Sequence, residues 1–208
     1  EGYLPDAIVN YLALLGWSPK ENKEIFSMEE LIKDFDPTRI SKSPAVYDIK
    51  KLQWINSHYI KNMKEEEYLT FVMPYLKEQY KLENYDNNWL QDLALLYKNE
   101  LKYGKEIVLL TKMFFEDNYT LNQEEQEFMN TEGIEKTINC FKEKIKNIKW
   151  TTENIKNAIL EVKSECNVSG KMLYMPIRIK TTGLMHGPEL DKTIYLLGEH
   201  KIMERLSK

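Results

Sequence analysis

Residues 41–61, SKSPAVYDIKKLQWINSHYIK, form the stretch that decides the fold of this chain. Apolar residues recur in it at three- and four-residue spacing, which is the pattern of one buried stripe along an α-helix. Ser43 stands where an N-cap residue is expected, and Pro44 follows at the first helical position, where a missing N–H costs nothing. We therefore predict an amphipathic helix that begins at Ser43. Its apolar stripe consists of Val46, Ile49, Leu52, Ile55 and Tyr59.

The remaining residues of this predicted helix are mostly polar. Trp54 lies off the apolar stripe, and we expect it to pack against a second element. On pattern alone, the stretch indicates a capped helix in an all-α domain. Its polar face consists of Asp48, Lys50, Lys51, Gln53 and Asn56.

Length and charge exclude several classes of protein. The chain has 208 residues, enough for one large or two modest helical domains, and a formal net charge of −4. Proteins that coat nucleic acid without sequence preference are usually basic, so neither DNA binding nor non-specific RNA binding is expected. No apolar run approaches the length of a membrane span, and no basic-then-apolar leader is visible. We expect a monomeric, cytoplasmic protein with no membrane partner.

No cluster of residues in the sequence indicates a catalytic centre. Cys140 and Cys166 lack CxxC spacing and nearby histidines, which is typical of reduced thiols on helices. The three histidines are scattered, and there is no Gly-rich loop of the kind that cradles a phosphate. The sequence therefore predicts no catalytic residue, no metal site and no cofactor held by this chain itself.

Helical periodicity continues along the chain, without strand-like alternation. The first predicted helix runs from Pro5 to Gly16, and Ser27 opens a second one through a capping box with Glu30. Pro74 is expected to end one helix and start another, because proline cannot continue a helix unkinked. The apolar face of the first helix consists of Ala7, Ile8, Tyr11, Leu12 and Leu15.

The same periodicity predicts antiparallel helices with short connections in the rest of the chain. Asp86 caps one of them, and the polar run at 116–119 is the predicted boundary between two helical subdomains. The predicted architecture is all-α, with three parts at residues 1–61, 62–118 and 119–208.

Two phrases near the start of the chain carry a resemblance to a known family. GYLPxAxxNYLxLLGW at residues 2–17 and IxKSPAxxDxxKLxWxNxxYI at residues 40–60 resemble adjacent segments of bacterial glutamyl-tRNA synthetases. Those segments follow the catalytic KMSKS loop. Residues 41–43 share letters with that loop, but we expect them to cap a helix. The resemblance implies that residues 1–61 form the connecting domain that contacts the inside of the tRNA L, and that the catalytic domain lies upstream.

A third phrase lies near the end of the chain. Residues 171–206, KMLYMPIRIKTTGLMHGPELDKTIYLLGEHKIMERL, resemble the family phrase PxRxAxTG…GPxLxxxxxLLGxxxxxxRL, with Lys180 where that phrase has alanine. The resemblance implies that residues 62–118 and 119–208 form a two-part helical anticodon-binding bundle of the class I synthetase type. The anticodon-reading residues that it implies are Arg178, Thr182, Gly187, Pro188 and Leu190.

The chemistry of these residues suits an exposed anticodon, whose bases can be splayed out. Arginine presents a planar fork of donors and a face for stacking, and threonine hydroxyls both donate and accept. Glycines allow close approach, and a helix that opens at Pro188 would offer N–H groups to a phosphate. Leu190 is expected to give a base an apolar platform. Without the resemblance, the same spacing fits a plain helix–loop–helix in which Arg178 forms a surface ion pair.

Lysines are the candidates for contacts with the tRNA backbone. Between residues 171 and 183 the charged side chains are all basic, which gives a local charge of +3 in an acidic chain. The four candidates are Lys42, Lys51, Lys171 and Lys180.

One position departs from the family pattern for the third anticodon base. Family members carry an arginine in an ERxKT-like phrase, whereas the corresponding stretch here, NELKYGKE at 99–106, has Glu100 at that position. A carboxylate only accepts hydrogen bonds, so it cannot replace arginine at a base edge. Either the correspondence is shifted here, or the protein screens the third base loosely and also accepts glutamine tRNA.

Taken as a whole, the resemblance implies the tRNA-binding, C-terminal part of a glutamate–tRNA ligase, non-catalytic by itself. The parent enzyme would activate glutamate with ATP and Mg and transfer it to glutamate tRNA, which is the expected partner. The alternative is an all-helical protein–protein interaction scaffold, which predicts no salt-sensitive affinity for RNA.

Overall fold

A computed structural model describes all 208 residues, and its regular elements are helices. Twelve α-helices and two short 3₁₀-helices form the fold, and an isolated antiparallel bridge joins Trp17 to Ile40. The all-α prediction is confirmed. None of the helices combines the length and the apolar character needed to cross a bilayer.

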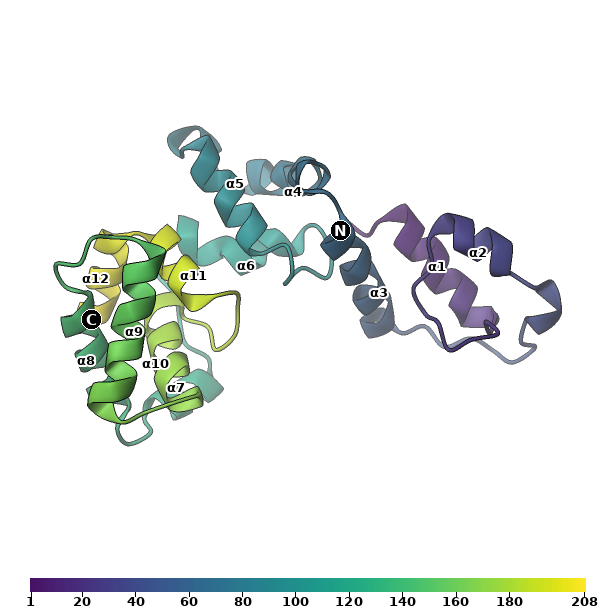
Figure 1. The fold of residues 1–208 in the computed structure, drawn as a ribbon. Coiled ribbons are helices and arrows are strands. Elements are labelled where there is room, and N and C mark those ends of the chain that lie inside the picture. Colours follow the sequence, from purple (N-terminus) through teal and green to yellow (C-terminus); the bar gives the residue numbers. More distant parts are fainter. The chain divides into compact units, whose positions relative to one another are not determined.

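The helices form two compact units. Figure 1 labels the helices and colours them in sequence order. The first unit comprises residues 1–85 and 97–109, and the second comprises residues 86–96 and 110–208. The first contains α1 (Pro5–Gly16), α2 (Met28–Asp34), η1 (Pro37–Arg39), α3 (Ile49–Asn62), α4 (Glu65–Gln79) and η2 (Leu82–Asn84). The second contains α5 (Asn87–Leu96), α7 (Gln123–Met129), α8 (Ile134–Ile145), α9 (Thr152–Cys166), α10 (Lys171–Thr182), α11 (Leu190–Leu197) and α12 (Glu199–Ser207). Helix α6 (Glu106–Phe115) contributes residues to both units. The domain boundaries predicted after residues 61 and 118 stay predictions.

Helix α3 begins later than the sequence predicted, and its N-cap is Asp48 instead of Ser43. The Asp48 carboxylate accepts two backbone N–H groups of the first turn, at 2.9 and 3.2 Å. A negative charge at this end also interacts favourably with the helix dipole, which a serine hydroxyl does not do. The Asp48 N–H donates to the Tyr11 hydroxyl at 2.7 Å, and residues 41–47 stay outside the helix. Val46 is consequently 81% exposed and does not belong to the buried stripe.

The buried face of α1 also differs from the predicted one. Tyr11 is buried, as expected, but Ile8 and Leu12 are 36% and 56% exposed. Asn10 takes a place on the buried face, because its amide donates to and accepts from the backbone of residues 24–26 at 3.0 and 2.9 Å. Apolar periodicity cannot reveal a polar side chain that is buried by virtue of its hydrogen bonds.

A second buried amide, Asn56 on α3, joins three segments of the first unit. We predicted it on the polar face, but it is fully buried. Its Oδ1 accepts the Leu4 N–H at 2.8 Å, and its Nδ2 donates to the Lys102 carbonyl at 2.6 Å. Beside it, the Gly104 N–H donates to the Gly2 carbonyl at 2.8 Å. The asparagine of the KLxWxN phrase therefore holds two backbone segments against α3.

Pro74 does not end a helix, so this prediction was wrong. Helix α4 runs unbroken through Pro74. Tyr68, Val72 and Leu76 continue the four-residue spacing across the proline, and all three are completely buried. Tertiary packing of this stripe outweighs the one helical hydrogen bond that proline removes.

In the second unit, α8, α9 and α10 pack against one another, and α11 and α12 complete the bundle (Figure 1). The hydroxyl of Thr151 caps α9 by accepting the Asn154 N–H at 3.2 Å. The bundle supports the carboxyl end of α10, where the candidate site lies. Its core includes Ile138, Phe141, Ile145, Ile155, Ile159, Val162, Leu173 and Ile177.

Candidate nucleic-acid interface

The candidate interface is the turn between α10 and α11, at residues 183–189. Helix α10 ends at Thr182, and Gly183 follows with φ at 75°. A left-handed residue in this place is a common way to terminate a helix. Helix α11 begins at Leu190, two residues after the start predicted at Pro188.

The side chain of Arg178 reaches across this turn. Its Nη2 donates to the carbonyl oxygen of Pro188 at 2.6 Å, and the side chain is half-buried. A Cβ at Gly187 would lie only 3.0 Å from Nη1, so glycine lets the guanidinium lie close to the backbone. A charge-assisted bond of this kind fixes the plane of the guanidinium. The structure thus brings Arg178, Gly187 and Pro188 together at one turn.

Thr182 shapes the turn from inside. It is 3% exposed. Its hydroxyl donates to the Arg178 carbonyl at 2.7 Å and accepts the Leu184 N–H at 3.1 Å. The backbone therefore occupies the donor and an acceptor site of this hydroxyl. In this structure Thr182 supports the turn, whereas we expected its hydroxyl to face a base.

Leu190 anchors the start of α11 in the core. It is 5% exposed, and Pro188 is buried as well. The exposed apolar platform that we expected from Leu190 is therefore not present. Gly187 is exposed and leaves the backbone of the turn accessible.

The three basic residues of α10 do not form one patch, because the segment is a helix. Successive residues in a helix are rotated by about 100°, so Lys180 lies about 200° from Arg178, on the opposite side. Lys171, seven residues before Arg178, returns to the same side, and its Nζ lies 4.9 Å from the centroid of the Phe128 ring. The local charge of +3 is therefore divided between two faces.

The predicted lysines of the first unit lie in different surroundings. Lys42 is exposed in the non-helical stretch before α3, whereas Lys51 forms an ion pair of 2.5 Å with a glutamate that precedes α2. We expected Trp54 to pack against a second element, and its ring contacts that of His58 on the same helix. Trp54 is 42% exposed, with its ring centroid 4.5 Å from that of His58. Lys50 lies exposed one helical turn before Trp54, and exposed aromatic rings beside cations are surfaces on which bases stack.

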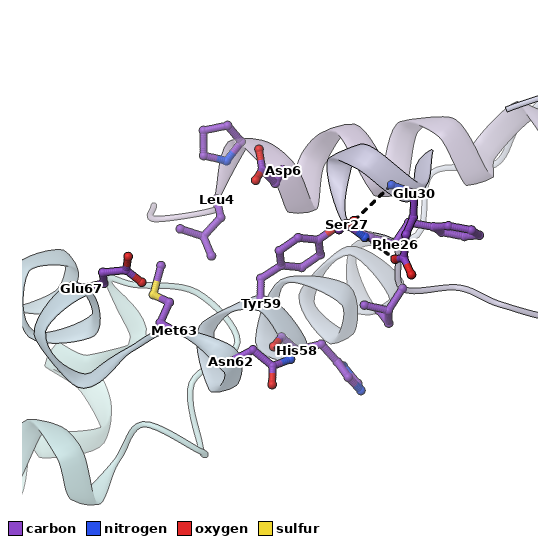
Figure 2. A pocket seen from close by; sticks show the side chains of 12 residues that line it. Leu4, Asp6, Phe26, Ser27, Glu30, His58, Tyr59, Asn62, Met63 and Glu67 are labelled. Atoms are coloured by element: carbon purple, nitrogen blue, oxygen red, sulfur yellow. Dashed lines mark hydrogen bonds between the residues drawn. The ribbon is translucent and has the colours of Figure 1, made fainter. Parts of the chain in front are cut away.

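A separate pocket of about 490 Å³ lies in the first unit (Figure 2). Its polar walls are engaged in the fold. The hydrogen bond and ion pair from Lys23, at 2.6 Å, lower the pKa of Glu30. The Tyr59 hydroxyl donates to the Phe26 carbonyl at 2.5 Å and lies 3.0 Å from Oδ1 of Asn10. Nowhere in the chain do three His, Cys, Asp or Glu side chains gather in a way that could hold a metal ion.

Glu100, at the position where the resemblance implies an arginine, lies exposed in the turn after α5. Its backbone N–H donates to the Tyr97 carbonyl at 2.9 Å. Whether Glu100 takes the place of the family arginine, or the correspondence is shifted here, stays a prediction.

Two residues that the sequence analysis left without a role lie at the carboxyl end of α10. Tyr119 donates its hydroxyl hydrogen to the Lys180 carbonyl, and Arg205 donates to the Thr181 carbonyl. Arg205 belongs to the C-terminal phrase that resembles the family, and this was the signal that could have revealed it. Tyr119 lies in the polar run that we interpreted only as a boundary.

Two family profiles match this chain, one over its first residues and one over most of the rest. The profile of the family described as "Anticodon binding domain" matches residues 66–208, which include the 183–189 turn. The profile described as "tRNA synthetases class I (E and Q), catalytic domain" matches residues 1–54.

Curated relatives resemble the chain over its whole length. The chain is 40% identical to a glutamate–tRNA ligase of Bacillus licheniformis and 42% identical to one of Listeria innocua. Each alignment covers 99% of this chain and 43% of the relative, so the chain spans less than half the length of these relatives. Among solved structures, a glutamate tRNA ligase from Elizabethkingia meningosepticum matches with a TM-score of 0.77 and 27% identity, over 99% of this chain and 41% of that one.

Proposed function

The chain belongs to the anticodon-binding domain family, and from this premise we propose that it is the tRNA-binding part of a class I glutamate–tRNA ligase. The relatives that match 99% of the chain carry that name. They favour this function over a protein–protein scaffold.

The observation that assigns the proposed role to particular residues is the Arg178 side chain, which is held across the 183–189 turn beside the exposed Gly187. Anticodon bases are unstacked, so they can present their edges and faces to such a turn. A guanidinium with a fixed plane can both donate to a base edge and stack on a base face. Arg178 is therefore the proposed base-contacting residue, and Gly187 gives the base access to the backbone.

Supporting roles are proposed for the other residues of the phrase. Thr182 and Leu190 would shape and anchor the turn, because their side chains are buried there. Lys42, Lys171 and Lys180 remain proposed contacts for the phosphate backbone, together with Lys50 and Trp54 on α3. Lys51 fits that role less well, because it is paired with a glutamate.

The proposed task of this chain is positioning. The parent enzyme would use ATP to activate glutamate, whereas the residues of this chain would bind and orient glutamate tRNA. Correct orientation of a substrate supplies a large share of the rate gain in an enzyme.

A titration with RNA tests the proposal. The chain is titrated with the anticodon stem–loop of glutamate tRNA and with a hairpin of the same stem and a scrambled loop, at several salt concentrations. We expect tighter binding of the cognate loop and a linear fall of log affinity with log salt, because phosphates are neutralised. Equal affinity for both loops, or no binding at low salt, would reject the anticodon function.

A further inference from the structure

The last carbonyl groups of α10 receive hydrogen bonds from outside the helix. The carbonyls of Lys180 and Thr181 would normally accept from residues four positions later, but the helix has ended by then. The Tyr119 hydroxyl donates to the Lys180 carbonyl at 2.6 Å, and Nη1 of Arg205 donates to the Thr181 carbonyl at 2.5 Å. Two side chains from distant parts of the sequence thus complete the end of this helix.

Arg205 joins this helix end to α6. It is 3% exposed, and its Nη2 donates to the Met113 carbonyl at 2.9 Å and to the Glu116 carbonyl at 3.4 Å. Carbonyls at the carboxyl ends of helices carry partial negative charge, so a cation is favourable there. Burial nevertheless lowers the pKa of Arg205, and its Nε has no hydrogen-bond partner in the protein. An apolar side chain of similar volume would fill the space without burying a charge. A guanidinium can donate to three carbonyls in two segments at once, here the carboxyl ends of α6 and α10.

Tyr119 contacts both Arg205 and the first residue of the turn. Its ring centroid lies 5.2 Å from the guanidinium carbon of Arg205. A Cβ at Gly183 would come within 2.4 Å of the Tyr119 ring, so the ring lies directly against the backbone there. Burial raises the pKa of Tyr119 above its usual range, and a phenol is protonated at neutral pH even without that shift, so the hydroxyl can donate.

We propose that Tyr119 and Arg205 are positioning residues for anticodon recognition, because they fix the helix end from which the 183–189 turn departs and so set the orientation of Arg178. Arg178 lies in the penultimate helical turn of α10. Its guanidinium donates to the Pro188 carbonyl, at the far end of the 183–189 turn. Movement of the helix end would therefore change the distance between Arg178 and the Pro188 carbonyl. This inference rests on the proposed anticodon function.

The test separates positioning from a contribution to stability. In the 208-residue chain, Tyr119→Phe removes the donor to the Lys180 carbonyl and keeps the ring. Tyr174→Phe is the matched control, since Tyr174 lies on α10, the helix whose end Tyr119 contacts, and is 44% exposed. Affinities are measured for the anticodon stem–loop of glutamate tRNA, for stem–loops with one anticodon base changed, and for the scrambled hairpin. The temperature is low enough that circular dichroism shows native helicity in every variant.

We expect Tyr119→Phe to weaken cognate binding by about two- to tenfold, the range for one lost hydrogen bond, and to leave scrambled-hairpin binding unchanged. The ratio between cognate and base-changed loops should fall by the same factor. Tyr174→Phe should change neither quantity. A merely stabilising hydroxyl would lower the melting temperature but leave that ratio unchanged, and this result would overturn the inference.

Arg205→Lys supplies a second, independent measurement. It keeps the charge but loses the fork, so it should also lower the ratio, and an unchanged ratio in the folded variant would count against the inference. If the wild-type chain does not distinguish the cognate loop, the proposed function fails together with the inference. If the wild-type chain distinguishes it and both variants do so equally well, only the inference fails.

Discussion

The two units use the polar residues of their sequence phrases in different ways. In the first unit, Asn10 and Asn56 are buried amides that join backbone segments. In the second unit, Arg178 spans a partly exposed turn, and Thr182 supports the backbone beneath it. All four belong to stretches that resemble the same family. A match to a phrase indicates that a residue is needed, whereas burial and hydrogen bonds indicate what it is needed for.

The largest effect on stability is expected from the buried amide of the first unit. Asn56→Ala leaves the Leu4 N–H and the Lys102 carbonyl without their partner in the interior. Unsatisfied buried groups cost about 1–3 kcal/mol each, so the free energy of unfolding should fall by about 3 kcal/mol or more. Urea denaturation measures the change. Asn62→Ala, at the exposed end of the same helix, is the control and should cost under about 0.5 kcal/mol. If both variants lost the same free energy of unfolding, the buried hydrogen bonds of Asn56 would not contribute more to stability than an exposed asparagine does.

The complementary variant in the second unit should change binding more than stability. Arg178→Ala should weaken binding of the cognate stem–loop by about 1–3 kcal/mol if the guanidinium contacts a base, as measured by fluorescence titration. Lys156→Ala removes an exposed cation of α9 and is the control for general charge. If Arg178→Ala and Lys156→Ala weakened binding equally, Arg178 would act only as a general positive charge, and the contrast drawn between the two units would be wrong.

Glu100 offers a test of specificity. Under the proposed function, and if Glu100 does stand at the arginine position, a glutamate–tRNA ligase that carries this chain should charge purified glutamine tRNA with glutamate, because an acidic side chain cannot reject the third base as an arginine would. We expect the two tRNAs to differ by less than about tenfold in kcat/KM, which corresponds to about 1.4 kcal/mol. Charging assays with each tRNA measure this ratio. No glutamyl product on glutamine tRNA would remove the hypothesis, and Glu100→Arg should raise the discrimination.

The smallest expected effect concerns a thiol that reports packing in the second unit. Burial, together with the neighbouring Cys166 thiol, raises the pKa of Cys140 to about 11. Only the thiolate reacts with iodoacetamide, so labelling at pH 8 should be about two orders of magnitude slower than for an ordinary cysteine. The rate should rise as the pH approaches 11. Mass spectrometry follows the labelling, and Asn56→Ala should not accelerate it if the units are independent in stability.

Local signals in the sequence were good guides to some helix ends. The capping box of Ser27 and Glu30 is present with both hydrogen bonds, and Asp86 caps α5 by accepting two backbone N–H groups. Each of these depends on residues within one helical turn. The sequence alone therefore contains what is needed to predict them.

Features that depend on distant partners were not predictable in the same way. Ser43 fails as a cap because Asp48 is available and is bonded to Tyr11, far away in the sequence. Leu190 was expected on the surface, but its burial is decided by the helices that pack around it. For the candidate site, the phrase around Arg178 indicated a turn whose role in anticodon binding stays a prediction. It could not show that Tyr119, from another part of the chain, holds the helix end.

The acceptor for Arg178 is a main-chain carbonyl, and this has a consequence for how specificity can change. A carbonyl oxygen is present whatever side chain stands at position 188, so a substitution there need not remove the acceptor, whereas position 187 has to stay small because a Cβ would lie 3.0 Å from Nη1 of Arg178. Related proteins can therefore exchange the side chains around this fixed cation and acquire new preferences for neighbouring nucleotides, while they keep the anchor itself unaltered.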